Sequence, residues 1–119
     1  MTGLRTEVRV HCGCNEDGHQ AVAFRTATPG LLVGQWVHKE GRDGRWAILH
    51  HATGLSVPYD FGDPETAMAC AQALTTHGRW LDVEPDYDLT AVVETLRSYG
   101  AEHAGYSRGP LVQRNEVPA

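Results

Sequence analysis

Apolar and polar residues alternate along the first half of the chain, and this alternation predicts a series of short β-strands. Over residues 4–12 the apolar residues Leu4, Val8, Val10 and Cys12 fall on one side and polar residues on the other, which is typical of a strand with one buried face. Similar short segments, bounded by glycine or polar turns, follow at residues 20–25, 31–38, 45–50 and 55–61. Pro58 lacks an amide donor, so the last strand should lie at a sheet edge or carry a bulge.

After residue 61 the hydrophobic period changes from that of a strand to that of a helix. Asp63 followed by Pro64 begins a helix over about residues 64–77, because an acidic cap and a proline suit the first turn. Apolar residues at helical spacing predict a second helix over about residues 87–99. We therefore expect an α+β fold, an antiparallel sheet of about five strands over residues 4–61 with both helices packed on one face.

The length of 119 residues suits a single domain. We expect this α+β domain over residues 1–105, and a flexible C-terminal tail over residues 106–119, where no period is sustained. No apolar run approaches the roughly 18 residues of a membrane span, and the N-terminus lacks the apolar stretch of a secretory signal. A cytoplasmic protein without a membrane partner is expected.

The net charge of −5 is spread unevenly along the chain. Residues 1–59 hold six basic and five acidic side chains, a balance of +1, whereas residues 60–119 hold four basic and ten acidic ones, a balance of −6. An acidic half disfavours non-specific binding of nucleic acid. It suits a protein that presents a negative face to a basic partner.

Acidic residues alternate with other residues between the two predicted helices, beside two aromatic ones. The candidate partner-binding residues are Trp80, Asp82, Glu84, Asp86, Tyr87 and Asp88. Acids around aromatics are typical of a protein-binding surface. Calcium binding by an EF-hand is not indicated, because the required glycine and glutamate positions hold Tyr87 and Val93. The alternative is a solvated loop whose aromatics fold inward and whose Asp86 or Asp88 caps the second helix.

The segment HCGCNEDGH, residues 11–19, gathers side chains that bind zinc. Cys12, Cys14 and His19 could converge at the tip of the first predicted hairpin, particularly if Gly13 forms a bulge. The alternative is that Cys12 packs in the core and the rest is a polar turn. Zinc is the one candidate cofactor. We find no phosphate-binding loop, hydrolase elbow or zinc-protease helix, so we expect a protein without catalytic activity.

Residues 35–77 run as strand, glycine turn, strand, turn, strand and then a helix that begins with DPETA. This order resembles the three-stranded sheet and helix of DNA-binding modules of the AP2 and integrase N-terminal type. The resemblance implies that the sheet reads the major groove. The residues it would use are Trp36, Lys39, Arg42, Arg45 and Trp46. Glu40 and Asp43 depart from this pattern, because they interrupt the positive charge.

In general character the chain also resembles small uncharacterised proteins carried by actinobacterial phages and plasmids, which implies a host or mobile-element protein as partner. The first functional interpretation is a non-catalytic inhibitor or regulator, of the anti-defence or immunity type, with an acidic surface for a protein whose surface is basic or mixed. The alternatives are a sequence-specific DNA-binding regulator using the sheet of residues 35–61, and a small zinc-binding protein at residues 11–19. An edge near Pro58 could also support a homodimer.

Overall fold

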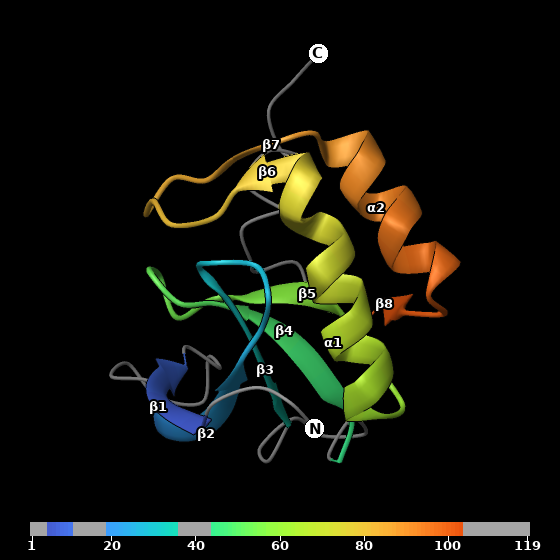
Figure 1. Ribbon diagram of the computed structural model, residues 1–119. Coiled ribbons are helices and arrows are strands. Elements are labelled where there is room, and N and C mark those ends of the chain that lie inside the picture. The colour runs from blue at the N-terminus through green and yellow to red at the C-terminus, as the bar shows by residue number, and fades with distance from the viewer. Residues whose placement is uncertain (1–4, 11–18, 36–43, 104–119) are drawn as a thin grey trace.

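A computed structural model describes residues 5–10, 19–35 and 44–103 of the chain, and its main element is an antiparallel meander (Figure 1). The strands are β1 (Arg5–Val10), β2 (His19–Arg25), β3 (Leu31–Gln35), β4 (Trp46–His50), β5 (Ser56–Phe61) and β8 (Glu102–His103). The sheet order is β1-β2-β3-β4-β5-β8, so neighbours in sequence are neighbours in space over the first five. This confirms the predicted five-stranded antiparallel sheet and adds the short β8, which lies beside β5.

The two predicted helices are confirmed. The first is α1 (Pro64–Ala73), which continues as the short 3₁₀ helix η1 (Leu74–His77). The second is α2 (Leu89–Ser98). Each begins at an aspartate, because the side chains of Asp63 and Asp88 accept hydrogen bonds from amides of the first turn. None of the helices in the described part of the chain is long and apolar enough to cross a membrane.

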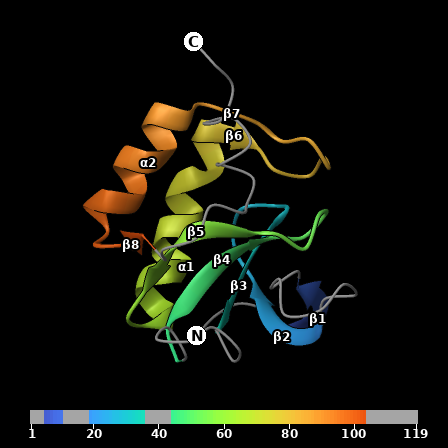
Figure 2. The ribbon, with the colours of Figure 1, turned by 180° about the vertical axis from the view of Figure 1, so that it is seen from behind.

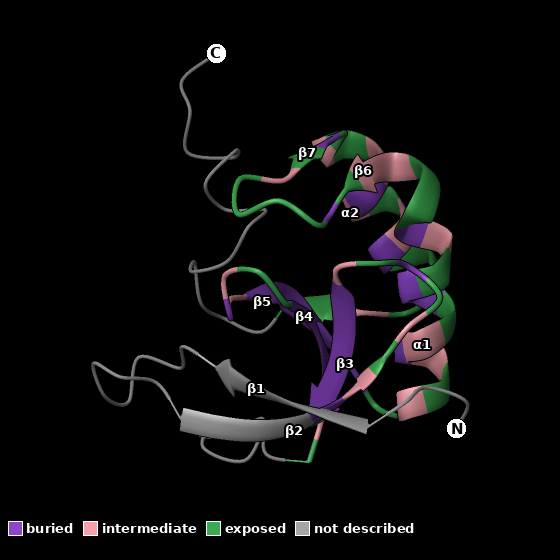
Figure 3. Cartoon of the chain, turned by 60° about the vertical axis from the view of Figure 1, so that its left-hand side comes forward, coloured by how far each residue is buried: buried purple, intermediate pink, exposed green. Residues whose placement is uncertain are grey.

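The hydrophobic core lies between one face of the sheet and the helices (Figure 3). Helix α1 lies against β3, β4 and β5, and α2 packs beside α1 and η1. The sheet contributes Leu31, Val33, Ile48, Val57, Tyr59 and Phe61 to this core, and the helices contribute Ala67, Cys70, Ala71, Leu74, Val92 and Leu96. The α+β class with both helices on one side of the sheet follows from this arrangement.

The central strands are buried on their second face as well. Leu32 pairs with Leu49, and both are almost fully buried although they point away from the core described above. In β5 every residue is buried, including Asp60. Strands covered on both faces read as continuous apolar runs rather than as alternating ones, and the sequence LLVG of β3 fits this rule.

Pro58 lies where the pairing of β4 and β5 is irregular. Ala47 is opposite Asp60 and Leu49 is opposite Ser56, so one residue of β4 faces three of β5. The break removes the need for an amide donor at the proline. The expectation that Pro58 marks an edge or a bulge is therefore confirmed in its second form, since β5 has neighbours on both sides.

Candidate functional site

A small hairpin separates the two helices and carries the predicted partner-binding residues. Its strands are β6 (Gly78–Arg79) and β7 (Asp86–Tyr87), which form a two-stranded sheet of their own. The amide of Asp88 donates to the carbonyl of His77 at 2.9 Å and closes the base of the hairpin. Figure 2 shows the connecting loop at the same end of the molecule as the β2–β3 and β4–β5 turns.

Trp80 anchors this hairpin to the rest of the molecule. Its indole ring is stacked on the ring of Tyr87, with centroids 5.2 Å apart and an angle of 14° between the planes. Its Nε1–H donates to the carbonyl of Leu74 at the end of the first helix, at 3.1 Å. The Trp80 side chain is only 2% exposed. A buried indole with its single donor satisfied holds the loop in one position.

Two glycines make room for this anchor. A Cβ on Gly78 would lie 2.8 Å from the indole ring of Trp80, and 2.7 Å from Cβ of Tyr87. A Cβ on Gly30 would lie 2.3 Å from the carbonyl oxygen of Trp80, and φ at Gly30 is +93°. Both the positive φ and the close approach require glycine in the β2–β3 turn.

His50 connects the sheet to the same loop. Its Nε2 lies 2.8 Å from the carbonyl oxygen of Trp80, and its Nδ1 lies 2.7 Å from the hydroxyl of Thr53. Because a carbonyl only accepts, Nε2 carries the proton. The Thr53 hydroxyl accepts from the amide of Leu55 and donates to Nδ1. Burial lowers the pKa of His50 below its ordinary value, against the opposite effect of the Trp80 carbonyl, so the ring is neutral at pH 7.

The loop between β6 and β7 exposes two aliphatic side chains. We call residues 81–85 the hairpin tip. Leu81 is 70% exposed and Val83 is 65% exposed, the highest values among large hydrophobic residues in the described ranges. They alternate with Asp82 and Glu84, which are exposed as well. These two exposed aliphatic side chains follow Trp80, the residue that anchors the hairpin to the core.

The structure brings the six predicted partner-binding residues together on this one hairpin. It agrees with the alternative interpretation given above, because Trp80 and Tyr87 fold inward and are 2% and 7% exposed. Of the acids, Asp88 caps α2 through the amide of Ala91 at 3.1 Å. Asp82, Glu84 and Asp86 are exposed.

Sequence reasoning missed Leu81 and Val83. The available signal was their position, because these two aliphatic residues flank Asp82 and belong to neither helical pattern.

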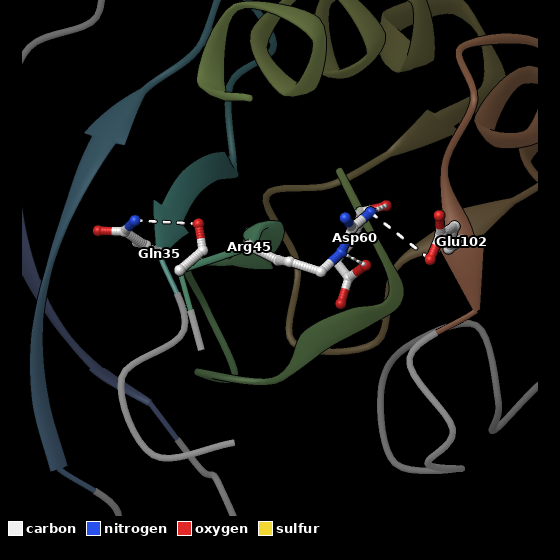
Figure 4. Close-up of polar contacts among 5 residues, drawn as sticks. Gln35, Arg45, Asp60 and Glu102 are labelled. Atoms are coloured by element: carbon white, nitrogen blue, oxygen red, sulfur yellow. Dashed lines mark hydrogen bonds and ion pairs between the residues drawn. The ribbon is translucent and has the colours of Figure 1, made fainter. Parts of the chain in front are cut away.

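The residues of the predicted DNA-binding face are described only in part. Nε of Arg45 donates to Asp60 Oδ1 at 2.6 Å, and Glu102 Oε1 lies 3.9 Å from the guanidinium (Figure 4). Trp46 packs against the core on the helix side of the sheet. Gln35 donates to the carbonyl of Gly44 at 3.0 Å and spans the ends of the connection that follows β3.

Arg45 and Trp46 therefore do not share one exposed face of the sheet. Trp36, Lys39 and Arg42 lie outside the described residues. The DNA interpretation stays a prediction, which a gel-shift titration at rising salt tests, because phosphate contacts weaken steeply with salt.

The predicted zinc residues also lie mostly outside the described part of the chain. Cys12 and Cys14 are not described, and His19 begins β2 opposite Val10, which confirms the predicted hairpin but not a site at its tip. Within residues 5–10, 19–35 and 44–103, no three His, Cys, Asp or Glu side chains gather to hold a metal ion. Cys70 is buried, and burial raises the pKa of its thiol to about 12.

Comparison with models of known protein families, with curated proteins and with solved structures finds no match for this chain.

Proposed function

We propose that this chain is a non-catalytic binding protein, an inhibitor or regulator that contacts another protein through its β6–β7 hairpin. The observation that carries the proposal is the exposure of Leu81 and Val83, at 70% and 65%, on a loop that the buried Trp80 holds in place. Covering exposed apolar side chains on association is favourable, because it removes apolar surface from water. The hairpin tip offers two such side chains, which are separated by Asp82 along the loop.

Charge around the tip supports a basic partner. Residues 77–88 contain one arginine and four carboxylates, Asp82, Glu84, Asp86 and Asp88, which give a formal balance of −3. All four carboxylates are exposed. Acids that surround an apolar contact speed the encounter with a positive surface and discriminate against a negative one.

The anchoring of the hairpin supports binding without a large entropic cost. Trp80 is fixed by its stack on Tyr87, by the hydrogen bond to Leu74 and by the contact of its carbonyl with His50. A loop that is already ordered loses little conformational freedom on association. The proposal therefore concerns a preformed surface rather than a segment that folds on binding.

The class of partner follows from the general resemblance to phage- and plasmid-borne proteins. We infer a protein of a host cell or of a competing mobile element, as an anti-defence or immunity factor would require. The acidic hairpin is consistent with a target whose own ligand is negatively charged, because such targets present basic surfaces.

The experiment is affinity capture from an extract of the source cell with matched variants. The test variant is Asp82→Asn/Glu84→Gln, and the control is Glu65→Gln/Glu94→Gln, which neutralises two exposed acids on the helices. We expect the wild type and the control to retain the same protein, and the test variant to retain about tenfold less. Equal capture by the test variant, or no specific capture by the wild type, contradicts the proposal.

A further inference from the structure

A pocket of about 260 Å³ opens beside the hairpin tip. Its walls come from the β2–β3 turn, from the end of the first helix and from the hairpin. The lining residues are Thr28, Pro29, Thr75, Gly78, Arg79, Trp80, Leu81 and Asp82. The pocket thus shares Leu81 and Asp82 with the proposed binding surface.

Hydrogen bonds fix the floor of this pocket. Thr28 is 2% exposed, and its hydroxyl donates to the carbonyl of Ala71 at 2.5 Å and contacts the hydroxyl of Thr75. Trp80 forms another wall of the pocket, and its ring is held by the stack on Tyr87 and by the hydrogen bond to Leu74. Since both walls are anchored to the core, the pocket exists before any ligand arrives, as ligand sites usually do.

The size and lining of the pocket indicate what it accepts. Pockets for small molecules usually measure about 300–1,000 Å³, and this pocket, at about 260 Å³, lies just below that range and has room for one side chain. The lining is mostly apolar carbon, and its charged members are Arg79 and Asp82. Exposed Leu81 at the rim would lose contact with water when a partner segment covers the opening.

We propose that the pocket receives one aliphatic side chain of the partner protein, from a segment that places a basic residue next to it. The lining selects the aliphatic side chain. The basic neighbour is attracted by Asp82, which lines the pocket together with Arg79, and by Glu84 two residues further along the loop, within a segment of residues 77–88 whose formal balance is −3. This inference rests on the proposed function and adds the short motif that the hairpin recognises. A segment with a basic residue beside an apolar one can fill the apolar pocket and contact the acidic residues at the same time.

The direct test is titration of the isotope-labelled full chain with three short peptides, followed by nuclear magnetic resonance. The probes are acetyl-Arg-Leu-Arg-amide, acetyl-Arg-Ser-Arg-amide and acetyl-Glu-Leu-Glu-amide. We expect the first to shift the amides of Thr75 and Gly78 and the indole N–H of Trp80. The other two should bind at least about tenfold more weakly, because one lacks the apolar side chain and the other has the wrong charge.

Two matched variants separate the pocket from the rest of the surface. Thr75→Phe places a ring at the pocket wall, whereas Thr76→Phe places the same ring on the next exposed residue, which does not line the pocket. The Arg-Leu-Arg shifts should be lost in the first variant and kept in the second. The inference would be overturned if all three peptides gave equal shifts, or if none gave any. It would also be overturned if the shifts fell on other residues, or if they persisted in Thr75→Phe.

These outcomes are independent of the capture experiment. If the partner is captured through the hairpin but the peptide series fails, the proposed function stands and the pocket inference does not. If both fail, the proposed function itself is contradicted.

Discussion

At the scale of single residues, His50 is a buried polar group that joins the sheet to the hairpin. It is fully buried at the end of β4, and both ring nitrogens are engaged, one by Thr53 and the other by the carbonyl of Trp80. Leaving either partner unsatisfied costs more than the hydrogen bond itself gains. The same residue makes the stability of the hairpin anchor sensitive to acid.

The first prediction concerns pH. The folded-state pKa of His50 is lowered, so the unfolded chain takes up the proton first as pH falls. The contribution of neutral His50 to the free energy of unfolding is complete at pH values above the ordinary histidine pKa of about 6.5. This contribution is lost as the pH falls below 6.5 toward the lower pKa of the folded state.

His50→Gln should lower the free energy of unfolding by about 1–3 kcal/mol at pH 8, and the difference from the wild type should shrink below pH 6.5. Urea unfolding at several pH values measures this. A difference that stays constant from pH 8 to pH 5 would contradict it.

The second prediction concerns Gly30, whose φ of +93° and proximity to the Trp80 carbonyl exclude a side chain. Gly30→Ala should cost at least about 1–3 kcal/mol from backbone strain alone, and more from the displaced carbonyl. Gly100→Ala is the matched control, because φ there is +79° but nothing lies within 4 Å of the added Cβ. If both variants lose the same stability, the close approach at Gly30 has no energetic consequence.

The third prediction concerns Cys70, whose thiol pKa of about 12 leaves almost no thiolate at neutral pH. In a Cys12→Ser/Cys14→Ser background the folded protein should not react with a thiol reagent such as dithionitrobenzoate at pH 8. Reaction should follow unfolding by urea. Rapid reaction of the folded variant would show that Cys70 is accessible.

At the scale of elements, the hairpin and α2 form one unit because Asp88 serves both. Its amide closes the hairpin base on His77, and its side chain caps the helix through Ala91. This acid therefore has a structural role that its neighbours Asp82 and Glu84 do not share. A variant that removes only its charge tests the difference.

Asp88→Ala should lower the free energy of unfolding by about 0.5–2 kcal/mol, because the cap is lost. Asp88→Asn should lose little, since asparagine caps as well as aspartate. Thermal or urea unfolding of both variants measures the difference. Equal losses for the two would mean that the charge, and not the capping hydrogen bond, stabilises α2.

Long periodic elements were predictable from sequence, and short ones were not. The alternation over residues 4–12 predicts strand β1, because it is long enough to show a period of two. The Asp63–Pro64 pair predicts the start of helix α1, because it stands directly before residues at helical spacing. Strands β6, β7 and β8 contain two residues each, too few to show a period. The inward turn of Trp80 depends on Gly30, 50 positions away in the chain, and no local pattern contains it.

At the scale of the whole molecule, the acidic residues of the second half have different structural roles, and Glu65 and Glu94 are simply exposed on the helices. Asp60 is buried against Arg45, and Asp63 and Asp88 cap helices, so these charges serve the fold. Asp82 and Glu84 are exposed beside Leu81 and Val83 and serve no helix or core contact described above. A charge count from sequence treats all of them alike, and only their positions show that Asp82 and Glu84 lie in the loop that carries the exposed Leu81 and Val83.

The most direct test of the central claim is site-specific photocrosslinking in the source cell. Val83→p-benzoylphenylalanine places the photoreactive group at the exposed hairpin tip, and Glu94→p-benzoylphenylalanine places it on the exposed side of α2 as control. After irradiation, a discrete adduct of this chain with one other protein should form from position 83 and not from position 94. Absence of an adduct at position 83, or the same adduct from both positions, would contradict binding through the hairpin.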